Sequence, residues 1–402
     1  MSITNLHKNF CPAPFRQLSI GPKGELTPCC LINNEGFGKV NGDSVDVSLD
    51  EILNGKEWQD FLNAHRNEQM PEICIKHCSW SGATAEYHNQ WQWAIGENWT
   101  EKEVKIERAD ISFSNICNLT CTMCNETFSS EWMKEKPDLN VKSWNFSERQ
   151  SKELATLVKD CKVINIKGGE PLMNQRFLSF LKELSQISVK PHIPVLSNGT
   201  TMNAEILEEL SKFSEPTIAF SLESTNDRLY SFIRGGKFTY SDTILTNLRY
   251  IKDNFPKIKV KVNYLIGAFN IDNMFEDMEK LINDGFDEIN VILISVGPIE
   301  QSLTVVHPSV KNPLGDKFLQ FVDEHKDNFF TLIKDNVHIN VSNDLKSKNF
   351  ELLSENELEH RIETVLNARK KQGLNLNDSI LDLVPNYYSN MSDVTSTLAN
   401  QT

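Results

Sequence analysis

Three cysteines, Cys117, Cys121 and Cys124, stand close together with the spacing C-x3-C-x2-C. Protein thiolates hold iron–sulfur clusters, and a [4Fe–4S] cube offers four irons for ligation. Three closely spaced thiolates therefore leave one iron open for another ligand. A structural zinc site needs four ligands, and no fourth Cys or His lies near the triplet in the sequence. The triplet therefore favours an iron–sulfur cluster with one open iron.

Three further segments carry residues suited to binding a small charged molecule. Glycines let a backbone approach a ligand, a carboxylate suits an ammonium group, and an arginine offers a fixed fork of donors to a carboxylate. Each segment alone is typical of a turn or a surface position. In chain order they are Lys167-Gly168-Gly169-Glu170-Pro171, Ser197-Asn198-Gly199-Thr200, and Phe220-Ser221-Leu222-Glu223-Ser224 with Arg234-Gly235 behind it.

Short β-rich runs alternate with amphipathic helical patterns between about residues 104 and 300. The predicted strands are Ala109–Phe113, Val163–Lys167, Ile193–Ser197, Thr217–Leu222, Lys259–Ile266 and Glu288–Ile294. The predicted helices are Ser147–Asp160, Gln175–Gln186, Asn203–Phe213, Ser241–Asn254 and Asp272–Asp284. Such repeats predict parallel strands with crossover helices. Six units suit a partial (β/α)6 TIM-like barrel of the α/β class, with a doubly wound sheet as the alternative, and the chemistry is expected at the carboxyl ends of the strands.

Composition excludes several classes of protein. The 402 residues are 39% hydrophobic and 24% charged, which is ordinary for a globular protein. A net charge of −14 argues against a nucleic-acid binder. The chain has no run of about 18 apolar residues and no apolar signal-peptide core at its N-terminus, so we expect a cytoplasmic protein without a membrane span. In that compartment, nine locally grouped cysteines indicate metal binding rather than disulfides.

Taken together, the cysteine triplet and the three segments behind successive predicted strands resemble the radical S-adenosylmethionine (SAM) enzymes. The resemblance implies that the triplet holds a [4Fe–4S] cluster whose open iron binds the amino and carboxylate groups of SAM. Met123, inside the loop, is either a cofactor contact or a packing residue. The family commonly carries Asp at the position of Glu223. The implied SAM contacts are Gly168, Gly169, Glu170, Pro171, Ser197, Asn198, Ser221, Glu223 and Arg234, with Met123.

A second resemblance concerns the N-terminal cysteines. Cys11, Gly24 and Cys29 are similar to the first half of the SPASM/twitch domain, in which a β-hairpin turn at the glycine brings two thiolates together. The module here precedes the barrel, and its late pair is C-x3-C, whereas the family usually has it after the barrel with C-x2-C. Cys30 can replace Cys29, and a structural zinc is the alternative to iron. The implied ligands of a second [4Fe–4S] cluster are Cys11, Cys29, Cys74 and Cys78.

The resemblance implies that SAM is cleaved reductively to a 5′-deoxyadenosyl radical, which takes a hydrogen atom from the substrate. We expect an oxidation or a crosslink of a peptide or of a small sugar or alcohol, assisted by the second cluster. A radical SAM epimerase, with Cys30 as candidate hydrogen donor, is one alternative. A non-catalytic iron–sulfur or zinc protein for electron transfer or scaffolding is another. The expected partners are SAM, the substrate and an electron donor such as flavodoxin or ferredoxin.

Three regions are expected along the chain. Residues 1–100 form the auxiliary-cluster module, with one helix at about Ser48–Asn67. Residues 101–300 form the partial barrel. Residues 301–402 form a helical extension, with helices at 313–337 and 354–372, and end in a polar tail.

Overall fold

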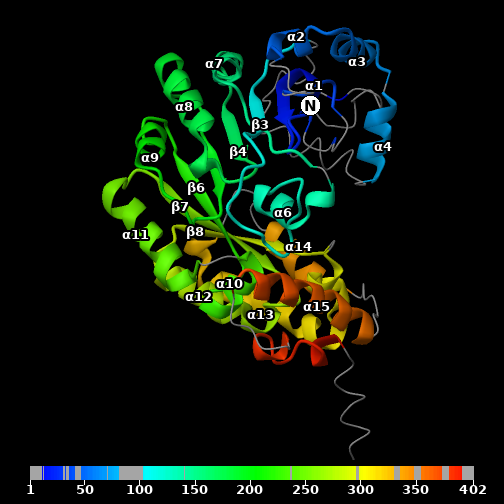
Figure 1. Cartoon of the computed structure of the whole chain (residues 1–402), viewed down its shortest axis with the longest axis vertical. Helices are drawn as coiled ribbons and strands as arrows, with labels where there is room; N and C mark the ends of the chain where they lie inside the picture. The colour runs from blue at the N-terminus through cyan, green and yellow to red at the C-terminus, as the bar shows by residue number, and fades with distance from the viewer. Residues whose placement is uncertain are drawn as a thin grey trace, which may run out of the picture.

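An open eight-stranded sheet forms the centre of the computed structural model, with the strand order β2-β1-β3-β4-β5-β6-β7-β8 (Figure 1). All neighbouring strands are parallel except β1 and β2. The strands are β1 Gln17–Ile20, β2 Leu26–Thr27, β3 Arg108–Ser112, β4 Val163–Lys167, β5 Pro194–Ser197, β6 Thr217–Leu222, β7 Lys259–Ile266 and β8 Glu288–Leu293. The structure describes residues 11, 13–29, 32, 36–40, 47–69, 71–80, 103–139, 141–235, 238–295, 298–329, 336–347, 355–373 and 380–391.

The six predicted barrel strands are confirmed as β3 to β8, with ends that shift by at most one residue. The α/β partial barrel is therefore confirmed as the fold class. β1 and β2 form the β-hairpin at Gly24 that the SPASM/twitch resemblance implied. They were not among the strands predicted from the pattern, because they are four and two residues long and include polar side chains such as Gln17 and Ser19. β1 pairs in parallel with β3, so the sheet runs across the boundary that we expected near residue 100.

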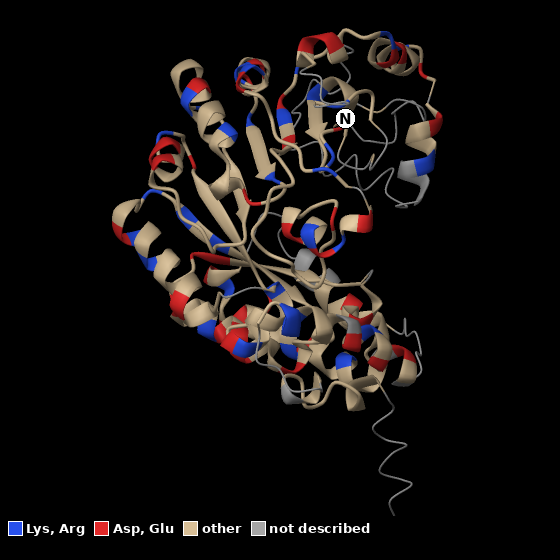
Figure 2. Ribbon diagram, viewed as in Figure 1, with Lys and Arg blue, Asp and Glu red and all other residues tan. Residues whose placement is uncertain are grey.

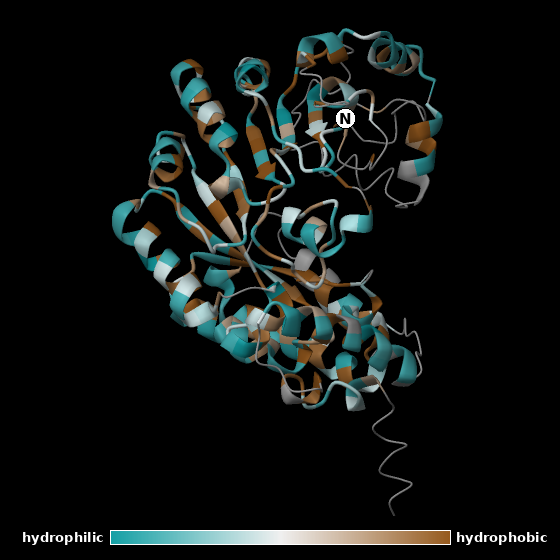
Figure 3. Ribbon diagram, viewed as in Figure 1, coloured by the Kyte–Doolittle hydropathy of each residue, from teal (hydrophilic) through white to brown (hydrophobic). Residues whose placement is uncertain are grey.

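Helices cover one face of this sheet (Figures 1 and 3). Alternate residues of β4 and β7 are buried and only partly buried, as expected for strands that pack one face against helices. The barrel helices are α7 Glu148–Leu157, α8 Gln175–Ile187, α9 Ala204–Leu210, α10 Asp227–Arg234, α11 Leu245–Asn254 and α12 Met274–Asn283. Of these, α10 was not predicted, and a π-helical turn, Tyr240–Ile244, leads into α11.

Further helices lie before and after the barrel (Figure 1). The single helix expected at 48–67 is two helices, because the chain turns at Asn54 and Gly55. The helix expected at 313–337 instead begins at Pro308 and ends at Glu324, whereas the one expected at 354–372 is confirmed. These helices are α1 Ala13–Arg16, α2 Leu49–Leu53, α3 Lys56–Arg66, α4 Glu72–Trp80, α13 Pro308–Glu324, α14 Asn336–Leu345 and α15 Glu355–Lys371. One more short helix, α6 Ser130–Glu135, lies within the barrel segment, between β3 and β4.

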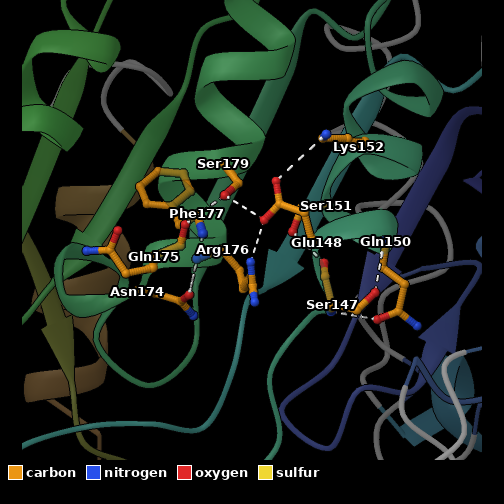
Figure 4. Close-up of polar contacts among 10 residues, drawn as sticks. All are labelled: Ser147, Glu148, Gln150, Ser151, Lys152, Asn174, Gln175, Arg176, Phe177 and Ser179. Atoms are coloured by element: carbon orange, nitrogen blue, oxygen red, sulfur yellow. Dashed lines mark hydrogen bonds and ion pairs between the residues drawn. The ribbon is translucent and has the colours of Figure 1, made fainter.

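Polar side chains fix the starts of α7 and α8 (Figure 4). Ser147 caps α7 in a capping box with Gln150. Asn174 caps α8 by accepting hydrogen bonds from the amides of Arg176 and Phe177. Glu148 joins the two helices, because its carboxylate pairs with Arg176 and accepts from Ser179 Oγ at 3.1 Å. The helices that follow β3 and β4 are thus aligned at the ends nearest the carboxyl edge of the sheet.

Acidic and basic residues are both spread over the outer helices (Figure 2). Several form pairs one helical turn apart, such as Lys56 with Asp60 and Arg149 with Glu153. Such exposed pairs contribute little to stability. Over the described part of the chain, no helix combines the length and the apolar character that a membrane crossing requires.

Candidate functional site

The cysteine loop, residues 116–124, follows β3 directly at the carboxyl edge of the sheet. The short helix α6 folds back onto it. Ser130 Oγ donates to the carbonyl of Cys117 at 3.0 Å and accepts from its amide at 3.1 Å. Trp132 Nε1 donates to the carbonyl of Cys121 at 3.0 Å. The backbone of the loop is therefore held at its first and second cysteines by side chains that follow it in sequence.

Distant segments hold the middle of the loop. The amide of Thr122 donates to the carbonyl of Ile233, at the end of α10, at 2.8 Å. The Thr122 hydroxyl donates to Gln301 Oε1 at 2.8 Å, and Gln301 is almost fully buried. The loop is thus anchored by segments that begin more than 100 residues later in the chain.

Gly168 and Gly169 bring the end of β4 against the loop. Both have positive φ, +86° and +58°. A Cβ on Gly169 would lie 2.3 Å from the carbonyl oxygen of Ile116, and one on Gly168 would lie 2.5 Å from Ser112 Cβ. The amide of Glu170 donates to that Ile116 carbonyl at 2.8 Å. Both glycines are therefore required by backbone conformation and by close approach, Gly168 to the end of β3 and Gly169 to the residue before the first cysteine.

The Glu170 carboxylate is enclosed by donors of the chain itself and is 1% exposed. It accepts from the Leu172 amide at 3.0 Å, from Ser197 Oγ at 2.9 Å and from the Asn198 amide at 2.7 Å. Burial raises the pKa of this carboxyl to about 7, and the three donors act in the opposite direction. Glu170 therefore joins the ends of β4 and β5, with Pro171 buried as the first residue of the following turn. Its predicted contact with SAM stays a prediction.

Asn198 connects the end of β5 to the loop. Its side-chain amide donates to Asn118 Oδ1 at 2.9 Å and approaches Cys117 Sγ at 3.8 Å. Asn118 donates in turn to Thr200 Oγ1 at 2.9 Å. Two of the predicted segments therefore meet at the first cysteine.

The third segment meets the loop at the second cysteine. Arg234 forms a two-pronged ion pair with Glu223, with Nε–Oε2 at 2.6 Å and Nη2–Oε1 at 2.5 Å, and both are buried. Its remaining nitrogen, Nη1, lies 3.6 Å from Cys121 Sγ. Burial raises the pKa of Glu223, and Arg234 opposes that rise. Because Glu223 uses Nε and one hydrogen of Nη2, the contact with a SAM carboxylate that we expected would have to use Nη1 or the second hydrogen of Nη2.

Two predicted contacts have less support from their surroundings. Ser221 is partly buried on β6, level with Asn263 of β7. Met123 is partly buried and packs against the hydrophobic core, in agreement with its interpretation as a packing residue. A contact of either residue with SAM stays a prediction.

The donor set fits a [4Fe–4S] cluster. Asn198 and Arg234 each direct an N–H toward a cysteine sulfur, as is common around cluster thiolates. Burial raises the pKa of the Cys121 thiol, and raises that of Cys124 to about 12, so without metal these groups are thiols. Among the described residues, no three Cys, His, Asp or Glu side chains converge as ligands of one ion. This agrees with a cube, because thiolates that bind different irons of one cube are spaced more widely than the ligands of a single ion.

The N-terminal cysteines lie on separate elements of their module. Cys11 precedes α1, Cys29 follows β2, and Cys74 lies on α4. Cys74 Sγ is 3.6 Å from Nε2 of His65, a fully buried side chain on α3. The backbone of Cys78 belongs to α4, but its side chain lies outside the described part, as does all of Cys30. The ligand set for a second cluster, and the choice between Cys29 and Cys30, stay predictions.

Sequence reasoning missed Arg369, which contacts the cysteine loop from α15. It is fully buried and lies on the same helix face as Ile362 and Leu366, seven and three residues earlier. This spacing is visible in the sequence, because a charged residue on an apolar helical stripe indicates a buried partner. The sequence did not show, however, that α15 contacts the cysteine loop.

Two family models match this chain. One is described as "Radical SAM superfamily" and matches residues 111–282, which contain the loop and the three segments. The other is described as "Iron-sulfur cluster-binding domain", SPASM, and matches residues 11–79. The two ranges contain the two cysteine groups, in the order predicted from the sequence. [4Fe–4S] clusters and SAM are thus the cofactors of this family and its module.

Similar proteins include GTP 3′,8-cyclases and a bacteriocin biosynthesis protein. A GTP 3′,8-cyclase of Clostridium perfringens is 24% identical over 224 residues, 54% of this chain and 56% of that protein. The subtilosin biosynthesis protein AlbA of Bacillus subtilis is 25% identical over 285 residues, 68% of this chain and 56% of that protein. The chain therefore spans a little over half the length of these curated relatives.

Solved structures give a weaker likeness. Streptococcus suis SuiB bound to S-adenosylmethionine is 13% identical, with a TM-score of 0.42 over 70% of this chain and 61% of that one. The family assignment depends instead on the matched ranges and on the loop geometry. Residues 111–282 of this chain form a domain of the radical SAM superfamily, and residues 11–79 form a SPASM-type iron–sulfur module ahead of it.

Proposed function

We propose that this protein is a radical SAM enzyme whose [4Fe–4S] cluster is held by Cys117, Cys121 and Cys124. When bound, the cluster and SAM supply one-electron cleavage of SAM to a 5′-deoxyadenosyl radical, which abstracts a hydrogen atom from the substrate. The carrying observation is the meeting of three separate segments at the cysteine loop, namely the ends of β4 and β5 and the end of α10. Glu170 N donates to Ile116 O, Asn198 approaches Cys117, and Arg234 approaches Cys121.

The residues around the loop have distinct roles in this proposal. Gly168 and Gly169 let the backbone come close enough to the loop for a small ligand to contact both. Asn198 and Arg234 direct N–H groups at the sulfurs and so stabilise their negative charge. Arg234 keeps Nη1 on the loop side, where it can meet a ligand carboxylate. Glu170 acts as a brace between β4 and β5.

A polar substrate is supported by the sheet face that the helices leave uncovered. Its partly buried positions include Asn165 on β4, Asn263 on β7 and Asn290 on β8. Asn165 donates to Asp110 at 2.7 Å, and Asn290 donates to Asn263 at 3.1 Å. Amide groups of this kind can exchange hydrogen bonds with a peptide backbone or with the hydroxyls of a sugar or alcohol.

We further propose an oxidation or a crosslink as the reaction, with a peptide as the favoured substrate. The likeness to AlbA, a protein of bacteriocin biosynthesis, supports the peptide. The SPASM match at 11–79 supports an auxiliary cluster that accepts the substrate electron. A flavodoxin or ferredoxin is the proposed electron donor to the loop cluster.

The central test is the formation of 5′-deoxyadenosine by anaerobically reconstituted protein with SAM and a chemical reductant. Wild type should form 5′-deoxyadenosine and methionine. The triple variant Cys117→Ala/Cys121→Ala/Cys124→Ala should form neither, whereas Cys161→Ala should behave as wild type, because Cys161 is buried beside β4, away from the loop. Persistent cleavage by the triple variant would exclude the assignment of the loop.

The reaction type is tested with the product made in D2O. An oxidation or crosslink leaves no new solvent deuterium on the attacked carbon. An epimerase that uses a thiol such as Cys30 as hydrogen donor introduces one deuterium there, because a thiol exchanges its proton with solvent. If the wild-type product carries this deuterium and the product of Cys30→Ala does not, epimerisation replaces the oxidation proposal.

A further inference from the structure

Arg369, near the end of α15, reaches the cysteine loop from the C-terminal extension. Its side chain is fully buried. Nη2 donates to the carbonyl of Thr120 at 2.5 Å, and Nη1 donates to the Thr120 hydroxyl at 3.0 Å. Nε donates to the carbonyl of Phe232, in the last turn of α10, at 2.7 Å. One guanidinium therefore joins the residue next to Cys121 to the helix that carries Arg234.

The surroundings fix this guanidinium on several sides. Gln372 accepts from Nη1 at 2.9 Å and donates to the Thr120 hydroxyl at 3.0 Å. The Trp132 ring of α6 lies 5.8 Å from Cζ, within range of a cation–π contact. A Cβ at Gly235 would lie 2.4 Å from the Thr120 hydroxyl and 2.6 Å from Arg369 Nη1. The loop, α6, α10 and α15 thus pack around one charged group.

The charge of Arg369 is not matched by a carboxylate. Its hydrogen-bond partners are two carbonyls, a hydroxyl and an amide, and in the described part of the chain no Asp or Glu oxygen lies within 4.0 Å of it. Arg234, the other buried arginine at the loop, is paired with Glu223. Burial lowers the pKa of Arg369 to about 10, which leaves it charged at neutral pH, and the charges of Cys121 and then of Glu135 act in the opposite direction. A buried cation with no carboxylate in contact is stabilised by a nearby anion, and a thiolate cluster is an anion.

We infer that Arg369 is a positioning residue for the loop cluster, which fixes Thr120 with Gln372 and sets a permanent positive charge beside Cys121. This inference rests on the proposed cluster at the loop. α15 lies outside both matched ranges, 11–79 and 111–282, so the contact belongs to the extension of this chain. A positive charge beside the cluster stabilises its reduced, more negative state, and therefore raises its reduction potential.

The test compares Arg369→Gln, Arg369→Lys and Lys371→Gln in full-length, reconstituted protein. Lys371 is exposed on the same helix. Its replacement removes the same unit of positive charge, but from a position where solvent and salt already screen it. The midpoint potential is measured for the cluster whose spectrum responds to added SAM, together with the rate of iron loss to a chelator. Arg369→Gln should shift the potential to more negative values and lose iron faster. Arg369→Lys should keep the potential close to wild type but lose iron faster, and Lys371→Gln should match wild type in both.

A purely structural role predicts a different pattern, in which both Arg369 variants lose iron faster and neither shifts the potential. That pattern would overturn the electrostatic part, and wild-type behaviour of Arg369→Gln would overturn the whole inference. If Arg369→Gln does not fold, Gln372→Ala tests the positioning part, since it should speed iron loss without a potential shift. The proposed function fails separately, if the triple cysteine variant still cleaves SAM.

Discussion

Glu170 is buried at the site, where its carboxylate accepts hydrogen bonds from the Leu172 amide, the Ser197 hydroxyl and the Asn198 amide. Glu170→Gln replaces one carboxylate oxygen by an NH2 group, so that one of the chain donors to Glu170, such as the Asn198 amide, would face another donor. An unsatisfied buried group costs about 1–3 kcal/mol. We expect the unfolding free energy to fall by this amount, which lowers the urea midpoint, and we expect the affinity for SAM to fall as well. Iron content should stay near wild type.

Equilibrium dialysis with SAM, iron analysis and urea unfolding together check this expectation. Glu208→Gln, at an exposed position of α9, is the matched control and should change none of the three. A large loss of iron in Glu170→Gln would show that Glu170 holds the cluster loop itself rather than the SAM side of it.

The ion pair of Glu223 and Arg234 is the other buried charged feature at this scale. Breaking a buried pair by removing one partner costs about 3–5 kcal/mol, because the remaining charge is left unpaired. Glu223→Gln should therefore lower the unfolding free energy of the metal-free protein by an amount of this order. Urea unfolding measures it.

The exposed pair Lys56 and Asp60 supplies the control for that prediction. Their side chains are 87% and 59% exposed, so Asp60→Asn should change stability by less than about 1 kcal/mol. In Glu223→Gln/Arg234→Met, much of the lost stability should return, since the orphan charge is gone. Equal effects of Glu223→Gln and Asp60→Asn would mean that the pair does not stabilise the fold.

At the scale of elements, the turn after β4 must fit against the loop after β3. Gly169→Ala places a Cβ 2.3 Å from the Ile116 carbonyl oxygen at a φ of +58°. The loop has to move, so iron bound per chain after anaerobic reconstitution should drop by the equivalent of one cluster, about four irons.

Gly285 offers a control that separates strain from collision. Its φ is +94°, and an added Cβ would meet nothing within 4 Å. Gly285→Ala should therefore cost about 1–2 kcal/mol of backbone strain and retain its iron. If both variants lose iron equally, general destabilisation rather than the collision with the loop is responsible.

At the scale of the whole molecule, the N-terminal module is part of the barrel sheet. β1 pairs with β3, and Gln17 Nε2 donates to Asp110 Oδ2 at 2.6 Å. The residues matched by the SPASM model are thus joined to the strand that leads into the cysteine loop. We expect the module and the barrel to unfold together.

The two clusters should nevertheless be chemically separable. Cys74→Ser/Cys78→Ser should reduce iron from about eight to about four per chain and keep slow SAM cleavage without substrate turnover. Iron analysis and 5′-deoxyadenosine formation check this. Complete loss of SAM cleavage in a protein with a native far-UV spectrum would argue that the loop cluster depends on the module.

Local patterns were enough to predict the six barrel strands and the order of the motifs. Val163–Lys167, Thr217–Leu222 and Lys259–Ile266 were predicted to the residue, because alternating burial leaves a period of two in the sequence. Gly168 and Gly169 were predicted to let the backbone approach a ligand; their positive φ is a conformation that favours glycine, and the ligand contact stays a prediction. The three cysteines likewise lie within eight residues of one loop, so their spacing is fully visible in the sequence.

The tertiary structure alone decided which groups those motifs meet. The four-residue β1 has no periodicity of its own and is a strand because β3 lies beside it. Glu170 is satisfied by donors 27 and 28 residues later, and Arg369 contacts Thr120 across 249 positions. Sequence reasoning sees neighbours along the chain, whereas a buried charge is satisfied by whatever the folded chain brings within hydrogen-bond distance. The sequence therefore determined the cofactor loop, and the fold determined which side chains surround it.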